Sequence, residues 1–226
     1  MVAAMMTYRV FNQNNALVAV STRELDDAAA GHGALPTHLA NAAGTARRHD
    51  LVSRLRETLT VTDRRNKLAA ARSLLALGDV DSVPMILEAA AGDEDEIAAN
   101  VFRALAKRIE GVDSVRRAFA NGDEDPATAG AIASIYSGTF DLTRDDADFL
   151  VEAIDAYLAG TRAWVKGMDR DEWRSDLYIL VRALARASVP PLNDPRARAV
   201  LARVADSRAD RDTKKEAKTL LDGSAK

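Results

Sequence analysis

Val-Asp-Ser-Val at residues 80–83 returns at residues 112–115, and Gly-Asp-Glu-Asp at residues 92–95 returns at residues 122–125. The first pair is offset by 32 residues and the second by 30, so one unit of helix, turn and helix is present twice, with a small deletion. Repeats of this length are typical of stacked helical hairpins, in which each hairpin packs only against its neighbours. The repeat therefore predicts an extended array of helices, an architecture that usually serves binding, and it leaves the ligand unidentified.

The composition also favours helices packed on helices. The chain has 226 residues, of which 47% are hydrophobic and only 5% aromatic, and alanine dominates. Small apolar side chains let helix axes approach closely, which suits helical layers better than sheets. There is no cysteine, which excludes disulfides and thiolate metal sites.

No targeting or membrane segment stands out in the sequence. Residues 1–6 lack the basic region and apolar core of a secretory signal. The longest strongly apolar run, at residues 177–181, is far shorter than the roughly 20 residues that a membrane span requires. We therefore expect a soluble cytoplasmic protein.

Two regions with different patterns divide the chain. Residues 1–45 form an N-terminal extension, in which two apolar runs flank a polar Asn-Gln-Asn-Asn segment and predict a β-hairpin over residues 7–20. An isolated hairpin is only marginally stable, so it either docks on the helices or remains a tail. Docked, it would form an end cap; it could also pair with a partner strand. Short helices follow, the first of them capped by Thr22. Residues 46–226 form a helical repeat domain.

Capping residues mark the expected helix ends. The predicted N-termini lie at Asp63, Ser82, residues 93–96, Thr143 and Asp212. Gly78, Gly111 and Gly160 are expected to end helices. The helix after the first acidic turn is expected to bury Ile97, Val101, Leu105 and Ile109.

Three segments share one pattern of apolar and basic residues: Ala-Ala-Arg-Ser-Leu at 70–74, Val-Phe-Arg-Ala-Leu at 101–105 and Leu-Val-Arg-Ala-Leu at 180–184. This pattern resembles the second-helix signature of HEAT repeats, which are of the armadillo type. The resemblance covers most of residues 47–226 and implies an all-α, right-handed α-solenoid of about four to five HEAT-like hairpins. Around residues 143–167 the spacing departs from the pattern, so an insertion or an irregular pair is expected there.

Basic side chains recur at matching positions of the predicted second helices. An arginine stands two residues before a leucine on each of three helices, and on two of them a second cation follows one turn later. In a solenoid these residues line up on the concave face, where they can meet an acidic peptide or a phosphate backbone. They can equally form a solvated face or ion pairs within the chain. The candidate binding residues on this face are Arg72, Arg103, Lys107, Arg182, Arg186 and Trp173.

Neither the acidic turns nor the histidines match a metal site. The acidic turns lack the alternating ligands and closing glutamate of a calcium loop, so we expect them to cap helices. The spacings of His32, His38 and His49 fit no metal pattern. No His-Glu dipeptide occurs, which excludes the paired iron motifs of HEAT-like hydroxylases. We expect no metal and no cofactor.

One constellation has the residue types of a catalytic site: Trp164, Trp173 and Asp176, with arginines nearby. DNA glycosylases built from HEAT-like repeats hold a cationic base with tryptophans and stabilise the transition state with an aspartate. The spacing from Trp173 to Asp176 is shorter than in that family, and the chain lacks a dense basic groove. Packing of the two rings in the core or at its rim is the competing interpretation.

The favoured function is a non-catalytic scaffold or adaptor that binds a protein segment, an acidic one being the best match to the arginines. One alternative is a HEAT-like DNA glycosylase or another nucleic-acid-binding protein. A second is a HEAT-like lyase or chaperone that delivers a cofactor, although nothing in the sequence marks a pigment site. No paired nucleophile and base and no glycine-rich phosphate loop is present, so an enzyme is not expected.

Overall fold

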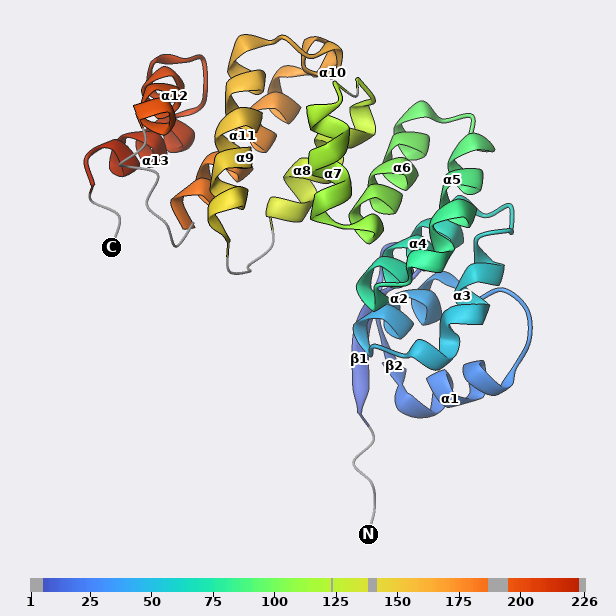
Figure 1. Ribbon diagram of the computed structural model, residues 1–226. Helices are drawn as coiled ribbons and strands as arrows, with labels where there is room; N and C mark the ends of the chain where they lie inside the picture. Colours follow the sequence, from blue (N-terminus) through green and yellow to red (C-terminus); the bar gives the residue numbers. More distant parts are fainter. Residues whose placement is uncertain (1–5, 123, 138–141, 187–194, 224–226) are drawn as a thin grey trace. The chain divides into compact units, whose positions relative to one another are not determined.

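The computed structural model describes residues 6–122, 124–137, 142–186 and 195–223. Over these residues the chain is predominantly α-helical, with one two-stranded antiparallel sheet near the N-terminus (Figure 1). The chain divides into two compact units, residues 1–114 and residues 115–226, and each is described by itself. None of the described helices is long and apolar enough to cross a membrane.

A β-hairpin opens the first unit. Strands β1 (Thr7–Phe11) and β2 (Leu17–Ser21) pair antiparallel, with Phe11 opposite Leu17. Side chains alternate between the two faces of a strand, and one face of the hairpin, with Val10 at its centre, packs against the helices and is buried. The predicted hairpin is therefore confirmed, and its apolar face is what holds it on the helices.

Helices fill the rest of the first unit. They are α1 (Thr22–Ala30), α2 (Thr37–Thr45), α3 (Val52–Thr58), α4 (Arg64–Leu77), α5 (Val83–Ala91) and α6 (Glu96–Glu110), with short 3-10 helices at His49–Leu51 and Val80–Ser82. Helix α4 packs against α2, α3 and α6, and α5 packs against α6. The hairpin lies beside α2. One continuous core of leucine, alanine and valine side chains joins these elements.

Helices α2 and α4 approach each other closely at Gly44. A Cβ atom at that position would lie 2.5 Å from Ser73 Oγ and 2.8 Å from Ser73 Cα. The Ser73 hydroxyl donates a hydrogen bond of 2.7 Å to the carbonyl oxygen of Ala40, which ties the two helices together inside the core. Only glycine allows this approach, so Gly44 sets the distance between the helices.

Several predicted caps are confirmed in the first unit. A cap involves only one side chain and the backbone amides within the next few residues, so the local sequence is enough to predict it. Asp63 accepts a hydrogen bond of 3.0 Å from the amide of Asn66 at the start of α4, and Gly78 ends that helix in the left-handed conformation. Asp95, in the first acidic turn, accepts from two amides at the start of α6. The acidic turn therefore caps a helix, as expected.

Two caps differ from the prediction. The N-cap of α1 is Ser21, one residue before the predicted Thr22, and Ser21 forms a reciprocal capping box with Glu24. Ser82 makes no capping hydrogen bond to α5; its hydroxyl donates to the carbonyl oxygen of Asp79 instead. Ser82 is the last residue of a 3-10 turn and has helical backbone angles, whereas a capping residue normally has an extended backbone.

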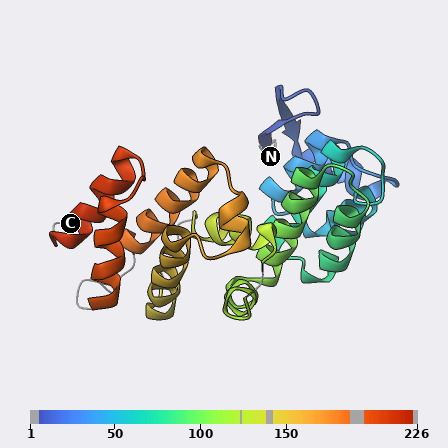
Figure 2. The same ribbon diagram turned by 90° about the horizontal axis from the view of Figure 1, so that it is seen from above.

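The second unit is also helical. The division between the units falls inside α7 (Val112–Ala120). The helices that follow are α8 (Pro126–Tyr136), α9 (Arg144–Ala159), α10 (Ala163–Gly167), α11 (Arg170–Arg186), α12 (Pro195–Asp206) and α13 (Arg211–Leu221). Helix α11 packs against α8, α9 and α13, and α12 packs against α9 and α13. The last two helices, drawn in red, lie side by side in both views (Figure 1, Figure 2).

The second unit also confirms and corrects individual predictions. Thr143 caps α9 in a capping box, and Gly160 ends that helix, both as predicted. The last helix is capped by Asp210, two residues before the predicted Asp212. The apolar pattern of residues 169–189 predicts one helix, and its last three residues, 187–189, lie outside the described residues.

The two copies of Val-Asp-Ser-Val differ in structure, and Ile97 was wrongly assigned to the core. Residues 80–82 form a 3-10 turn before α5, whereas residues 112–115 lie inside α7. Ile97 was expected in the core but is 78% exposed, because α6 buries an alanine-rich face that includes Ala98 and Phe102.

The finer architecture stays a prediction. In each unit the helices pack against one another. The right-handed solenoid of four to five hairpins rests on the sequence resemblance alone. The boundary at residues 45 and 46 also stays a prediction. Within the first unit, α2 of the predicted extension packs directly on α4 of the predicted repeat domain.

The close contact at Gly44 predicts the sign of a substitution. In the interior of a helix, Gly→Ala normally stabilises by about 1 kcal/mol. At Gly44 the added methyl group meets Ser73, so we expect Gly44→Ala to lower the free energy of unfolding by about 1–3 kcal/mol. Urea denaturation measures the change. Gly92→Ala is the control, because a Cβ there lies 3.7 Å from its nearest neighbour. A stabilised Gly44→Ala variant would contradict the tight contact.

Candidate functional site

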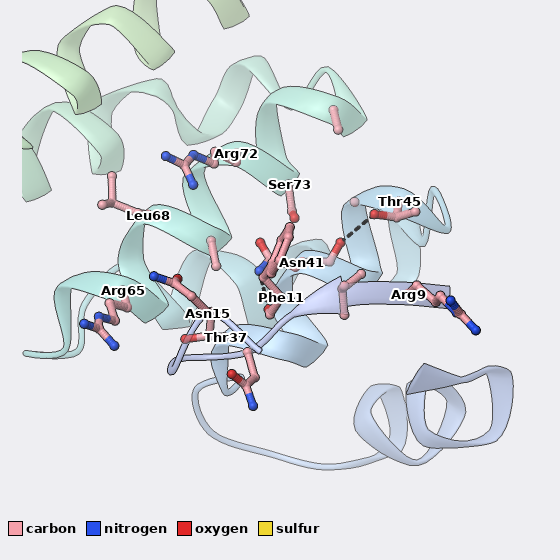
Figure 3. Close-up of a pocket in the computed structure, with 15 residues that line it drawn as sticks. Arg9, Phe11, Asn15, Thr37, Asn41, Thr45, Arg65, Leu68, Arg72 and Ser73 are labelled. Atoms are coloured by element: carbon pink, nitrogen blue, oxygen red, sulfur yellow. Dashed lines mark hydrogen bonds between the residues drawn. The ribbon is translucent and has the colours of Figure 1, made fainter. Parts of the chain in front are cut away.

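A groove of about 600 Å³ lies between β1, α2 and α4 in the first unit (Figure 3). It is lined by Arg9, Val10, Phe11, Asn12, Asn15, Thr37, Asn41, Gly44, Thr45, Arg65, Leu68, Ala69, Arg72, Ser73 and Ala76. Its volume is in the range of ligand sites in proteins. We call it the arginine groove, after Arg9, Arg65 and Arg72.

The floor of the groove comes from one face of α2. Thr37, Asn41, Gly44 and Thr45 are spaced so that they share this face. They are small or polar, which leaves room above them. The Asn41 side-chain amide donates a hydrogen bond of 2.9 Å to the carbonyl oxygen of Phe11, so the α2 face lies directly beside β1. The groove is therefore a consequence of how the hairpin docks on α2.

The far wall of the groove is a stripe along α4. Arg65, Leu68 and Arg72 follow each other at intervals of three and four residues and share one helix face. Arg65 donates a hydrogen bond to the backbone carbonyl of Gln13 in the hairpin turn. The stripe therefore alternates a cation, an apolar side chain and a cation, and its first member also holds the hairpin against the helix.

The charge of the groove has one sign. Three of its lining residues are arginines and none is an aspartate or glutamate. Arg9 and Arg72 are exposed, and no ion pair to either is present among the described residues. A guanidinium group presents a planar fork of donors that matches a carboxylate or a phosphate. The groove is therefore chemically suited to an anionic ligand.

The predicted binding residues are distributed over both units. Arg72, Arg103 and Lys107 belong to the first unit, and only Arg72 lines the groove. Arg103 and Lys107 lie on α6 and are half-buried, and the Arg103 guanidinium donates to the side-chain oxygen of Asn100. Arg103 is thus engaged within its own helix.

The other predicted residues lie in the second unit. Arg182 is exposed, with its guanidinium 5.9 Å from the centre of the Tyr178 ring. Arg186 donates a hydrogen bond of 3.3 Å to the carbonyl oxygen of Tyr136. Trp173 is only 4% exposed, so it is a core residue rather than an open anchor for a ligand.

Sequence reasoning identified Arg72 but missed Arg9 and Arg65. Arg65 lies two helical turns before Arg72, and this spacing was a signal that could have been read from the sequence. Arg9 joins them only because the hairpin docks beside α2, and no local pattern predicts that arrangement.

The tryptophans and Asp176 form a packed cluster in the second unit. The Trp173 indole N–H donates to the carbonyl oxygen of Tyr157 at 3.1 Å, and the Tyr157 ring lies 5.3 Å from the Trp164 ring. The guanidinium of Arg208 lies 4.9 Å from the centre of the Trp173 ring. Because both indoles are buried, neither presents an open face on which a base could stack.

Asp176 is the titratable group of this cluster. Its carboxylate accepts a hydrogen bond of 2.9 Å from the Tyr157 hydroxyl. Burial raises the pKa of Asp176 to about 6, and the nearby Glu172 carboxylate acts in the same direction, while the Tyr157 hydrogen bond opposes the shift. Burial also raises the pKa of Tyr157 well above its usual value. The Asp176 carboxyl is therefore easier to protonate in the folded chain than in water.

A second buried carboxylate, Asp146, is fully occupied by structural contacts. It accepts hydrogen bonds from the amide and hydroxyl of Thr143, from the Tyr136 hydroxyl at 2.9 Å and from the Arg116 guanidinium. Burial alone would raise its pKa, but the Thr143, Tyr136 and Arg116 interactions lower the pKa below its usual value. Asp146 therefore stays charged and joins α7, α8 and α9.

Known proteins do not assign a family to this chain. Comparison with protein-family models, with curated proteins and with solved structures finds no match. No candidate metal site is present either: within the described ranges, no group of three or more histidine, aspartate or glutamate side chains is placed to hold a metal ion. The arginine groove is therefore the candidate site on its geometry and charge alone.

The raised pKa of Asp176 predicts a pH dependence of stability. The folded chain favours the protonated carboxyl, so this contribution is fully present below about pH 4 and is lost as the pH rises through about 6. The expected loss is about 2–3 kcal/mol. Asp176→Asn keeps a neutral partner for Tyr157 and should remove this slope, as measured by urea denaturation between pH 4 and 7. Asp171→Asn, on the exposed side of the same helix, is the control and should keep it. An unchanged slope in Asp176→Asn would contradict the assignment.

Proposed function

We propose that this protein is a non-catalytic interaction scaffold that binds an acidic protein segment in the arginine groove. The observation that carries the proposal is the charge of the groove, which is lined by Arg9, Arg65 and Arg72 and has no carboxylate among its lining residues. An anionic ligand in the groove is attracted to all three cations. A segment with two or three carboxylates gains charge-assisted hydrogen bonds, which are about twice as strong as neutral ones.

The lining of the groove favours a peptide over a nucleic acid. Phe11 and Leu68 supply apolar surface, and the side chains of Asn12, Asn15 and Asn41 supply donors and acceptors for a backbone. Phosphate backbones are usually bound by broad basic surfaces, whereas this chain has a net charge of −3. A peptide uses all three kinds of groups in the groove, while a nucleic acid uses mainly the arginines.

The arrangement of helices supports a scaffold. Within the first unit α4 packs between α2 and α6, as second helices do in HEAT-like hairpins, and the right-handed solenoid that the sequence resemblance implies is part of this proposal. Such arrays present long surfaces for extended segments. The buried tryptophans leave the glycosylase alternative without a base-binding face.

Charge reversal tests the proposal. An array of octapeptides that carry aspartate or glutamate at two to four positions serves as the probe, and the same array with asparagine and glutamine serves as the neutral reference. The wild-type protein should prefer the acidic array. Arg65→Glu/Arg72→Glu should weaken binding of the best acidic peptides at least tenfold, because carboxylates then face carboxylates.

The matched control reverses two exposed arginines outside the groove, Arg144→Glu/Arg198→Glu, and should bind these peptides like the wild type. Circular dichroism establishes that both double variants are folded. No preference for acidic peptides in the wild-type protein would refute the proposal. So would a single-stranded oligonucleotide that binds more tightly than any peptide and is lost in Arg65→Glu/Arg72→Glu.

A further inference from the structure

We propose that the acidic segment binds as an added β-strand on the outer edge of β1, an inference that rests on the proposed function. An exposed strand edge offers a row of unpaired backbone groups to a partner chain. Strand addition at β1 requires outward backbone groups without a hydrogen-bond partner, an edge that faces the groove, and side chains along that edge that suit an acidic segment.

The hydrogen bonds at the two ends of β1 show which groups are free. The carbonyl oxygen of Met6 accepts from the amide of Thr22 at 3.0 Å, and the amide of Asn12 donates to the carbonyl oxygen of Ala16 at 3.0 Å. Opposite residues in an antiparallel pair alternate between bonded and non-bonded positions. Residues 6, 8, 10 and 12 therefore face β2, and the backbone groups of residues 7, 9 and 11 face the other edge.

This outer edge faces the arginine groove. Residues 9–12 line the groove, and the Asn41 side-chain amide reaches the edge at the carbonyl oxygen of Phe11 (Figure 3). The backbone groups of Thr7 and Arg9 make no hydrogen bond outside the β1–β2 ladder among the residues that the structure describes. At the Phe11 carbonyl, the Asn41 amide thus takes the place that an amide of an added strand would occupy. The outward backbone groups of Thr7 and Arg9 remain for pairing with an added strand.

The side chains along the edge define what the added strand carries. Phe11 and Leu17 are opposite each other on the outer face and are 58% and 55% exposed, so they form an apolar cross-strand pair without a cover. Arg9 lies on the same face, two residues from Phe11. Directly opposite residues in a sheet lie about 4.5–5.5 Å apart, close enough to interact. An added strand is therefore expected to place an acidic residue opposite Arg9 and an apolar one opposite Phe11.

The other face of the added strand points toward the helices. Side chains alternate along a strand, so every second residue of the segment faces α2 and α4, where Arg65 and Arg72 lie. Acidic residues on this face meet these arginines. The segment is thus extended and about five residues long, like β1 itself, and it carries carboxylates on both faces.

A second copy of the chain is a poorer occupant of the same edge. An antiparallel pairing between the outer edges of two β1 strands that is centred on residue 9 places Arg9 opposite Arg9 of the other copy. Like charges directly opposite each other destabilise a strand pair. The charge of the groove therefore selects an acidic partner rather than another copy.

Backbone methylation of the peptide tests the binding mode separately from the proposed function. The tightest acidic peptide from the array is resynthesised with N-methyl groups on the odd residues or on the even residues. Strand addition predicts that one set loses at least tenfold in affinity, because its amides donate to β1, while the other set changes by less than threefold. Equal losses in the two sets would refute strand addition and leave acidic binding in place. Failure of every unmethylated acidic peptide to bind refutes the proposed function itself.

A pair of variants tests the same edge from the protein side. Arg9→Pro and Arg9→Val both remove the charge, but only proline removes the outward amide, and the bonds from β1 to β2 remain. We expect Arg9→Pro to bind the peptide at least fivefold more weakly than Arg9→Val. Equal affinities would refute strand addition. If Arg9→Pro does not fold, as judged by circular dichroism, the methylated peptides decide the question.

Discussion

The contact between α2 and α4 at Gly44 and Ser73 brings together the two helices that form the arginine groove with β1. Because glycine has no side chain, the Ser73 hydroxyl reaches the backbone of α2 and bonds to the carbonyl oxygen of Ala40. This fixes the face of α2 on which Asn41 stands and, through Asn41, the position of β1. Arg65 and Arg72 then face the strand from α4. The groove thus results from close backbone packing, which leaves small side chains on its floor.

Local features of the fold could be predicted from the sequence, and features that depend on packing could not. Asp63, Asp95 and Thr143 were recognised as caps because a cap needs only its own side chain and the next amides. Ile97 was misplaced because alanine fills much of the buried face of α6. Alanine is favourable anywhere in a helix, so it does not mark which face is buried, and the larger apolar residue was assigned to the core.

The candidate site shows the same limit. Arg72 was identified from its position in a repeated pattern, whereas Arg9 reaches the groove through the docking of a hairpin more than 50 residues away in sequence. Trp173 illustrates the opposite case. Its charged neighbours in the sequence suggested a binding residue, but its ring is covered by Arg208 and its indole N–H is satisfied by Tyr157. A long, flexible cation can cover an aromatic ring, so charged neighbours do not establish that the ring is open.

The arginines of the groove are exposed or line its walls, whereas the core that holds the groove consists of leucine, alanine and valine. Substitutions at exposed positions usually change stability by less than about 0.5 kcal/mol. Charge at positions 9 and 72 can therefore change during evolution with little effect on folding. The backbone of β1 remains the same whatever side chains it carries. The charge of the groove is thus free to diverge between lineages while the helical framework is retained.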